Sequence, residues 1–327
     1  MIGRREFITL LGGASAWPLA ARAQQTAMPV IGVLGSETPE LFADRLRSFR
    51  QGLGETGYAE GRNAAIDYRW ANGHYDRLPE LAADLVRQRV AIIITLGSTA
   101  AAFAAKGATS AIPVVFQIGS DPVANGLIAS LNRPGSNLTG VTTLGAEIVP
   151  KRLEVLHEAV PAATVVAALL NPASGRPEGQ SRELQAAGRK LGLQVPILFA
   201  STERDLDTVF ATLPQLQAGG LLIGGQPFLA SRSEKLAGLA LQHKVIAVSQ
   251  QRAFAASGGL MSYGNNDAEA SRLVGSYTGR VLRGERPTDL PVQQVTRIEL
   301  IINMKTAKTL GVTFPLTLLG RADEVIE

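Results

Sequence analysis

The residues of this chain that could bind a ligand are small polar side chains at the ends of short apolar runs. Four such turns have the sequences GSTA at 97–100, GSDP at 119–122, NPAS at 171–174 and GGQPF at 224–228. If each run is a strand and each turn opens a helix, hydroxyls and free backbone N–H groups meet at a helix N-terminus, which attracts anions. Ser98 and Thr99 then suit the binding of a carboxylate, although the same residue types are also common helix caps.

Charged and aromatic residues near these turns could supply the other contacts of a small solute. Asp121 precedes Pro122, which suits the first turn of a helix, so its carboxylate could either cap that helix or pair with a ligand cation. Phe228 and Tyr263 could form aromatic walls, although aromatic side chains are more often part of a hydrophobic core. Because both halves of the chain carry such turns, the sequence predicts a binding cleft between two similar units.

Groups for covalent or metal chemistry are not visible in the sequence. The chain has no cysteine, and its three histidines, His74, His157 and His243, stand at no spacing typical of metal ligands. The serine elbow of hydrolases, the phosphate-binding loop and the GxGxxG dinucleotide fingerprint are also missing. We therefore expect a binding protein without cofactor or metal and not an enzyme. A hydrolase or isomerase built on the same units is the weakest alternative.

The elements that must position these turns alternate between short β-branched runs and longer amphipathic segments, a pattern typical of parallel sheets covered by helices. The first half is expected to have strands at 30–34, 64–68, 91–96, 114–117 and 138–141, with helices at 41–54, 78–89 and 151–160. The second half is expected to have strands at 165–170, 195–199, 220–223 and 245–248, with helices near 181–191, 203–213 and 230–243. This predicts an α/β fold of two doubly wound lobes, whose strands end at a cleft.

The alternation changes after Gly258, which predicts that the chain crosses back between the lobes. A short strand at 260–263, a helix at 267–283 and a strand at 299–303 follow, and Asp267 is placed to cap the helix. We expect a first lobe of residues 28–145 with about 262–290, and a second lobe of 146–261 with about 291–327. The tail after residue 305 is expected to strap the lobes.

The first 23 residues are expected to be an export signal. Arg4 and Arg5 precede an apolar stretch, and Ala21 and Ala23 frame a cleavage site, as in twin-arginine signal peptides. Thr9 stands where that pattern often has lysine, so the general secretory route stays open as an alternative. Because there is no cysteine to carry a lipid, the product is expected to be free in the periplasm and not lipid-anchored.

Composition gives no reason to expect a large charged partner. The chain has 32 lysines and arginines and 28 acidic residues, and its formal net charge falls from +4 to +2 without residues 1–23. A chain this close to neutral has no electrostatic case for binding nucleic acid or an anionic membrane. No later segment has about 18 consecutive apolar residues, so we expect no membrane insertion of the mature chain.

Several segments have a specific pattern when they are taken together. The longest is GSDPVANGLIASLNRPGSNLTG at 119–140, and it is accompanied by VIGVLG at 30–35, FRQGL at 49–53 and the turns at 97–100 and 171–172. This combination resembles the tryptophan/tyrosine-type family of ABC-transporter substrate-binding proteins, over nearly the whole chain after the signal. The resemblance implies a type I periplasmic binding protein, in which two Rossmann-like lobes are joined by a three-strand hinge.

The resemblance also implies which residues contact the solute. They are Gly35, Ser36, Ser98, Thr99, Asp121, Asn171, Gln226, Phe228 and Tyr263. Ser98 and Thr99 would hold a carboxylate, Asp121 would meet an amine or hydroxyl, and an aromatic ring would stack on the apolar part. Many relatives have Thr-Pro where this chain has Ser98 and Thr99, which keeps a hydroxyl but loosens the turn.

The function implied by the resemblance is capture of a small solute, such as an amino acid or aromatic compound, between the two lobes. A monomer in its closed form would deliver the solute to an ABC permease and ATPase complex. A ligand-sensing protein that uses the same lobes to regulate a partner receptor is the alternative. Neighbouring genes for a permease and an ATPase would favour transport, whereas a kinase gene would favour sensing.

Overall fold

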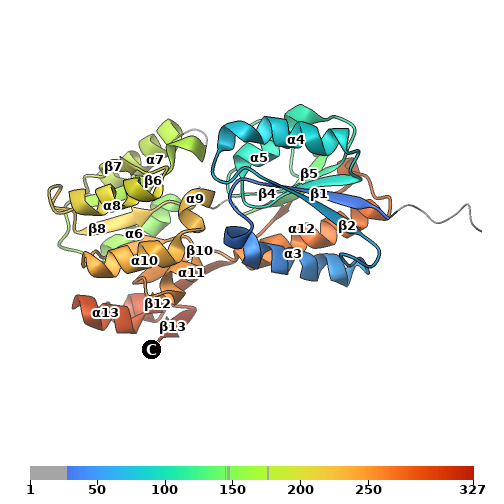
Figure 1. The fold of residues 1–327 in the computed structure, drawn as a ribbon. Helices are drawn as coiled ribbons and strands as arrows, with labels where there is room; N and C mark the ends of the chain where they lie inside the picture. The colour runs from blue at the N-terminus through green and yellow to red at the C-terminus, as the bar shows by residue number, and fades with distance from the viewer. Residues whose placement is uncertain (1–27, 144, 146–147, 175–176) are drawn as a thin grey trace, which may run out of the picture.

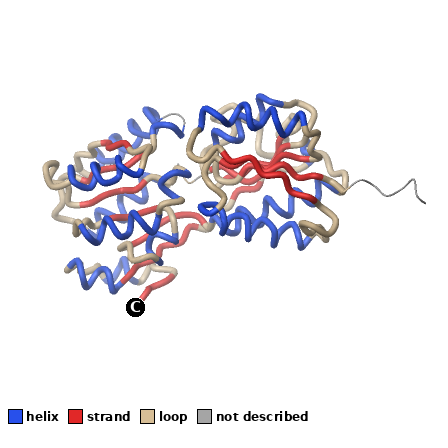
Figure 2. The backbone as a smooth tube through the Cα atoms, viewed as in Figure 1, coloured by secondary structure: helices blue, strands red, loops and turns tan. Residues whose placement is uncertain are grey.

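Two α/β lobes lie side by side in the computed structural model, which describes residues 28–143, 145, 148–174 and 177–327 (Figure 1). The predicted signal, with Arg4, Arg5, Ala21 and Ala23, lies outside the described residues. Within the described ranges, no helix is both long and apolar enough to cross a membrane. Each lobe has one sheet flanked by helices, so the predicted class of two doubly wound α/β lobes is confirmed (Figure 2).

The first lobe is built on a six-stranded parallel sheet of order β11-β5-β4-β3-β1-β2. Its strands are β1 (Val30–Gly35), β2 (Ala65–Trp70), β3 (Ile92–Thr95), β4 (Val114–Ile118), β5 (Leu138–Thr142) and β11 (Gln293–Gln294). Helices α4 (Leu78–Arg87) and α5 (Thr99–Ala108) cover one face, and α3 (Ala43–Glu55) and α12 (Asp267–Leu282) cover the other (Figure 1). Strands β3 and β4 are buried throughout because both faces are covered, which explains their continuous apolar runs.

The second lobe is built on a seven-stranded sheet of order β13-β12-β10-β9-β8-β6-β7, in which only the β10–β12 pair is antiparallel. Its strands are β6 (Val166–Leu170), β7 (Ile197–Phe199), β8 (Gly220–Ile223), β9 (Ala247–Ser249), β10 (Met261–Asn265), β12 (Ile298–Asn303) and β13 (Glu324–Ile326). Its helices are α6 (Val149–Ala159), α7 (Pro177–Lys190), α8 (Glu203–Thr212), α9 (Pro227–Ala230), α10 (Ser233–Gln242), α11 (Arg252–Ala256), α13 (Met304–Leu310) and α14 (Leu316–Leu319). The helix expected near 230–243 is α10, which begins at Ser233 after the separate short helix α9.

The chain passes between the two sheets three times, after β5, after β10 and after β11. Residues 262–265 belong to β10 in the second sheet, and residues 293–294 form β11 in the first; the domain boundaries expected from the sequence stay a prediction. The expectation that the tail straps both lobes is wrong. Strand β13 pairs with β12, and Phe314 and Leu318 pack in the core of the second lobe.

Helices α3 and α12 approach each other closely because glycines stand at their contact. A Cβ atom on Gly52 would lie 1.8 Å from the carbonyl oxygen of Arg272, and one on Gly275 would lie 2.1 Å from that of Phe49. Helix α12 begins after Asn266, whose side chain accepts a hydrogen bond from the N–H of Glu269. The expected cap at Asp267 is therefore wrong, and its carboxylate pairs instead with Arg45 at 3.0 Å.

Substitution of Gly275 by alanine is expected to destabilise the first lobe, because the added methyl group has no space between two backbones. Overpacking of this kind costs about 1–3 kcal/mol of unfolding free energy. Gly238→Ala in α10 is the matched control, since nothing lies within 4 Å of its added Cβ. That change is expected to leave stability unchanged or raise it by up to about 1 kcal/mol through helix propensity. Equal urea midpoints for the two variants would contradict the close approach.

Candidate functional site

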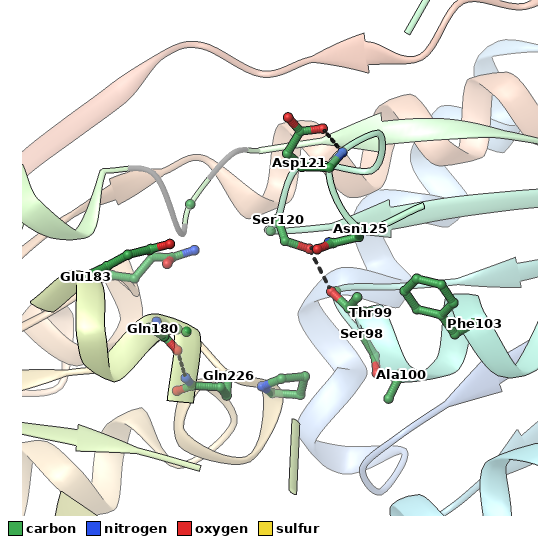
Figure 3. Close-up of a pocket in the computed structure, with 18 of the residues that line it drawn as sticks. Ser98, Thr99, Ala100, Phe103, Ser120, Asp121, Asn125, Gln180, Glu183 and Gln226 are labelled. Atoms are coloured by element: carbon green, nitrogen blue, oxygen red, sulfur yellow. Dashed lines mark hydrogen bonds between the residues drawn. The ribbon is translucent and has the colours of Figure 1, made fainter. Parts of the chain in front are cut away.

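A cavity of about 1010 Å³ lies between the lobes, where the strands of both sheets end. The first lobe lines it with the turns that follow β3 and β4, and the second lobe lines it with the start of α7 and the turn that follows β8. Figure 3 shows side chains of both lobes facing the same space. The position agrees with the rule that α/β proteins bind ligands beyond the carboxyl ends of their strands.

A cluster of hydroxyl and amide groups marks the N-terminus of α5. The Oγ1 atom of Thr99 lies 3.2 Å from the Oγ atom of Ser120, and Nδ2 of Asn125 donates to that Ser120 oxygen at 2.7 Å (Figure 3). The hydroxyl of Ser98 is buried and caps α5 by accepting from the N–H of Ala101. Thr99 at the start of α5 and Ser120 in the turn after β4 are therefore the hydroxyls that are arranged for a ligand, and the positive end of the helix suits a carboxylate.

Asp121 lines the cavity, and its carboxylate also organises the turn in which it lies. Its Oδ1 atom accepts hydrogen bonds from the N–H groups of Val123 at 2.7 Å and Ala124 at 3.1 Å. The helix expected after Pro122 does not form, because residues 122–126 are a turn, so the carboxylate organises a turn and does not cap a helix. A contact between Asp121 and a ligand cation stays a prediction.

The second lobe presents amide and carboxylate groups to the same cavity. Gln226 donates its Nε2 to Oε1 of Gln180 on α7 at 2.7 Å, and Glu183 on α7 faces the cavity beside them (Figure 3). The Oε1 atom of Gln226 is buried and has no hydrogen-bond partner among the residues described. A buried oxygen without a donor, on a side chain that lines the cavity, suits the ammonium or hydroxyl group of a solute.

Gly35 and Ser36 lie at the end of β1, as expected, but both are buried. A Cβ atom at Gly35 would lie 2.1 Å from the ring of Trp70, so the glycine allows that ring to cover the strand end. The Oγ atom of Ser36 is buried without a hydrogen-bond partner within the described part of the chain. Solute contact at these two residues stays a prediction.

The remaining three predicted contacts lie in the second lobe and are not among the residues that line the cavity. Asn171 is 2% exposed, and its Oδ1 accepts from the N–H of Ala173 at 2.9 Å. Phe228 is 3% exposed in the core of the lobe, with the guanidinium of Arg232 4.0 Å above its ring. Tyr263 on β10 packs against the other core cluster of that lobe. Their roles as ligand contacts stay predictions.

A buried ion pair joins the two lobes beside the cavity. Glu37, which follows β1 and is 1% exposed, accepts from Nη1 of Arg232 at 3.2 Å and from the hydroxyl of Tyr75 at 3.0 Å. The pKa of Glu37 lies above its ordinary value, because the effect of burial exceeds the lowering by the hydrogen bonds from Tyr75 and Arg232. Arg232 also pairs with Glu203 of its own lobe. The pair therefore connects the end of β1 in the first lobe to the start of α10 in the second.

Sequence reasoning missed several residues of the cavity. Ser120 and Asn125 stood within the quoted segment at 119–140, but only Asp121 was assigned a role. Gln250 follows strand β9, so the same strand-end argument that selected Gln226 could have found it. Gln180 carried no comparable signal, because it lies inside an amphipathic helix rather than at a strand end.

Comparison with known proteins connects this geometry to a family. The family model described as ABC transporter substrate binding protein matches residues 37–326. A curated relative, named a tyrosine-binding protein of Clostridioides difficile (strain R20291), is 25% identical over 270 residues, which cover 81% of this chain and 75% of the relative. This chain is similar to it over most of both lengths.

Solved structures show the same fold. The ABC domain of Streptococcus pneumoniae in complex with L-Trp has a TM-score of 0.81 at 24% identity, and the match covers 92% of this chain and 100% of that one. The ligand-free, open structure of a substrate-binding protein from Clostridium difficile has a TM-score of 0.62 at 23% identity, over 91% of this chain and 99% of the other. These neighbours have the type I periplasmic-binding-protein fold that the sequence predicted.

The match of the family model extends from Glu37 to within one residue of the end of the chain, and so includes both lobes and every wall of the cavity. The relatives named above are binding proteins. The chain belongs to the family of ABC transporter substrate-binding proteins, and the resemblance to its tryptophan/tyrosine-type members is confirmed.

Proposed function

We propose that this chain is the solute-capturing component of an ABC import system and that its solute is an amino acid. The observation that carries the proposal is the cavity of about 1010 Å³ between the lobes, with Thr99 and Ser120 at the N-terminus of α5 on one side. Such an arrangement suits a carboxylate, while Gln226 and Glu183 on the other side suit an ammonium group. The names of the relatives, a tyrosine-binding protein and a domain in complex with L-Trp, support the same class of solute.

Closure of the lobes would convert binding into a signal for the permease. At nearly equal identity and coverage, this chain superposes better on the complex with L-Trp than on the ligand-free, open structure. The Glu37–Arg232 pair across the lobes supports the interpretation that the present arrangement is near the closed state. A solute that contacts both lobes favours the closed state by its differential affinity, and a permease complex could then recognise that state.

Export to the periplasm as a free monomer is part of the same proposal. It rests on the twin-arginine pattern at Arg4 and Arg5, the cleavage site at Ala21 and Ala23, and the lack of cysteine. The direct experiment is a fusion of residues 1–27 to a reporter protein, followed by fractionation. A reporter that stays in the cytoplasm would contradict export, and export that survives Arg4→Lys with Arg5→Lys would assign the general secretory route.

The solute class is tested by a thermal-shift screen of the twenty common amino acids with the chain from residue 24 onward, followed by calorimetry on each hit. We expect at least one aromatic amino acid to raise the melting temperature and to bind with one site per chain. Turnover of the bound solute during the measurement would instead indicate an enzyme. The lack of any shift with all amino acids would reject the proposed class.

A further inference from the structure

A buried cation lies beside the cavity, next to the lining residue Gln250. Arg152 on α6 is completely buried. Its Nε donates to the backbone oxygen of Tyr263 at 2.8 Å and its Nη2 donates to Oε1 of Gln250 at 3.3 Å, while Nη1 is buried and has no partner among the described residues. No carboxylate in the described ranges forms an ion pair with it. Burial of a guanidinium in this way lowers the free energy of unfolding unless an anion lies near.

The charge of Arg152 persists in this environment. Burial lowers the pKa of Arg152 to about 10, so the guanidinium still carries its proton at neutral pH. Charges interact strongly where water is excluded, and a buried cation favours an anion several ångströms away. Arg152 does not itself line the cavity, and Gln250 lies between them.

Gln250 is held in one orientation by its surroundings. It is 8% exposed, follows β9, and lines both the large cavity and a smaller one of about 410 Å³ on the other side. Glycines pack around it: a Cβ on Gly145 would lie 2.7 Å from its Nε2, and one on Gly225 would lie 2.2 Å from its Oε1. Because a guanidinium can only donate, Arg152 takes the carbonyl oxygen of the amide and leaves the two N–H donors of Nε2 for another group.

We propose that Gln250 donates a hydrogen bond from the second lobe to the carboxylate of the solute, and that Arg152 is the positioning residue that fixes this donor and favours an anion. The proposal deepens the proposed function and rests on it, since it assigns an anionic solute to the same cavity. Thr99 and Ser120 offer donors from the first lobe, so one carboxylate can be held from both lobes. The anionic group is then what couples binding to closure.

The test replaces Gln250 by glutamate. The new carboxylate pairs with Arg152, so the melting temperature is expected to stay equal or rise, whereas the donor is lost and a negative charge faces the solute. We expect the affinity for L-tyrosine or L-tryptophan, measured by calorimetry, to fall by at least about tenfold, as for loss of one hydrogen bond to a charged group. Gln251→Glu is the matched control, because it adds the same charge at the next residue, which has no contact with Arg152. An affinity within about threefold of the parent chain is expected there, since Gln251 is not among the residues that line the large cavity.

The role of Arg152 needs a readout that a merely structural role would not change. That readout is the ratio of affinities for L-tyrosine and L-tyrosinamide, which differ in the charge of the carboxyl group. Arg152→Lys is expected to preserve the preference for the acid and Arg152→Met to reduce it by about tenfold or more. If Arg152→Met does not fold, the affinity of Gln250→Glu for the amino acid still shows whether the inference holds.

Acetate separates failure of this inference from failure of the proposed function. We expect acetate to raise the melting temperature of the parent chain above that in chloride at equal ionic strength, and not to raise that of Gln250→Glu. If acetate shifts the melting temperature in this way but no amino acid binds, the anion site is supported and the proposed solute class is rejected. If L-tyrosine binds the parent chain and Gln250→Glu equally well, the inference is rejected and the proposed function is retained. If neither acetate nor an amino acid shifts the melting temperature of the parent chain, both the inference and the proposed function are rejected.

Discussion

Exchange of Arg232 for methionine is expected to destabilise the chain and to shift its lobes toward an open arrangement. The change leaves the carboxylate of Glu37, which is 1% exposed, without its cation. Removal of one partner from a buried pair costs about 3–5 kcal/mol, and we expect the lower end because the side chain of Arg232 is 17% exposed. Opening of the lobes would hydrate Glu37 and relieve part of this cost, so the radius of gyration from small-angle scattering should increase.

The defect of Arg232→Met is expected to depend on pH in a defined direction. Burial raises the pKa of Glu37, and removal of Arg232 takes away a group that lowers it, so the pKa rises further in the variant. The folded chain then binds a proton more tightly than the unfolded chain. The loss of unfolding free energy is therefore largest at neutral pH and shrinks as the pH falls through the raised pKa toward the ordinary value of 4.5.

A pair of the same type within one lobe provides the control. Arg252 and Glu324 lie 2.8 Å apart in the second lobe, and their side chains are 53% and 43% exposed. Arg252→Met is expected to change the unfolding free energy by less than about 1 kcal/mol and to leave the radius of gyration unchanged. If Arg232→Met behaves like Arg252→Met in urea titration and in scattering, the pair between Glu37 and Arg232 does not hold the lobes together.

The double variant Thr99→Val with Ser120→Ala is expected to lose most of the affinity for an amino acid. Thr99 at the N-terminus of α5 and Ser120 after β4 share a hydrogen bond of 3.2 Å, and both hydroxyls can turn to donate to a carboxylate when that bond is given up. A hydrogen bond to a charged group contributes about 1.5–3 kcal/mol, so loss of two weakens binding by roughly a hundredfold or more. Calorimetry with the best ligand from the screen measures this loss directly.

The matched control for this double variant is Thr208→Val, on the exposed surface of α8. It makes the same change of side chain far from the cavity and is expected to leave affinity unchanged. Circular dichroism should show that all variants are folded. A double variant that binds the ligand as tightly as Thr208→Val would remove the hydroxyl cluster from the site.

The sequence predicted most of the fold because local patterns determine most of it. Buried strands such as β3 and β6 appear as continuous apolar runs, and the strand-end rule then located Thr99 and Gln226 at the cavity. The sequence predictions were wrong where one local pattern allowed two different structures. Asn266 rather than Asp267 caps α12, because both residues are good caps and the register of the helix decides between them.

The rest of the site depends on contacts between residues far apart in the sequence. Glu37 meets Arg232 across 195 positions, and Arg152 meets Gln250 across 98. Nothing in the local pattern around these residues indicates their partners, since each one is an ordinary polar residue of an amphipathic segment or turn. The sequence also could not place Phe228, because an aromatic residue after a strand end can lie in a core or line a cavity. In the structure it lies in the core of the second lobe.

A crystal structure of the chain with its best amino-acid ligand would show directly whether the solute is captured between the lobes. We expect one ligand in the cavity between the lobes, with its carboxylate at Thr99 and Ser120 and with contacts from both lobes. Electron density for the ligand on the outer surface of either lobe, or in the cavity with contacts to one lobe only, would contradict capture by closure.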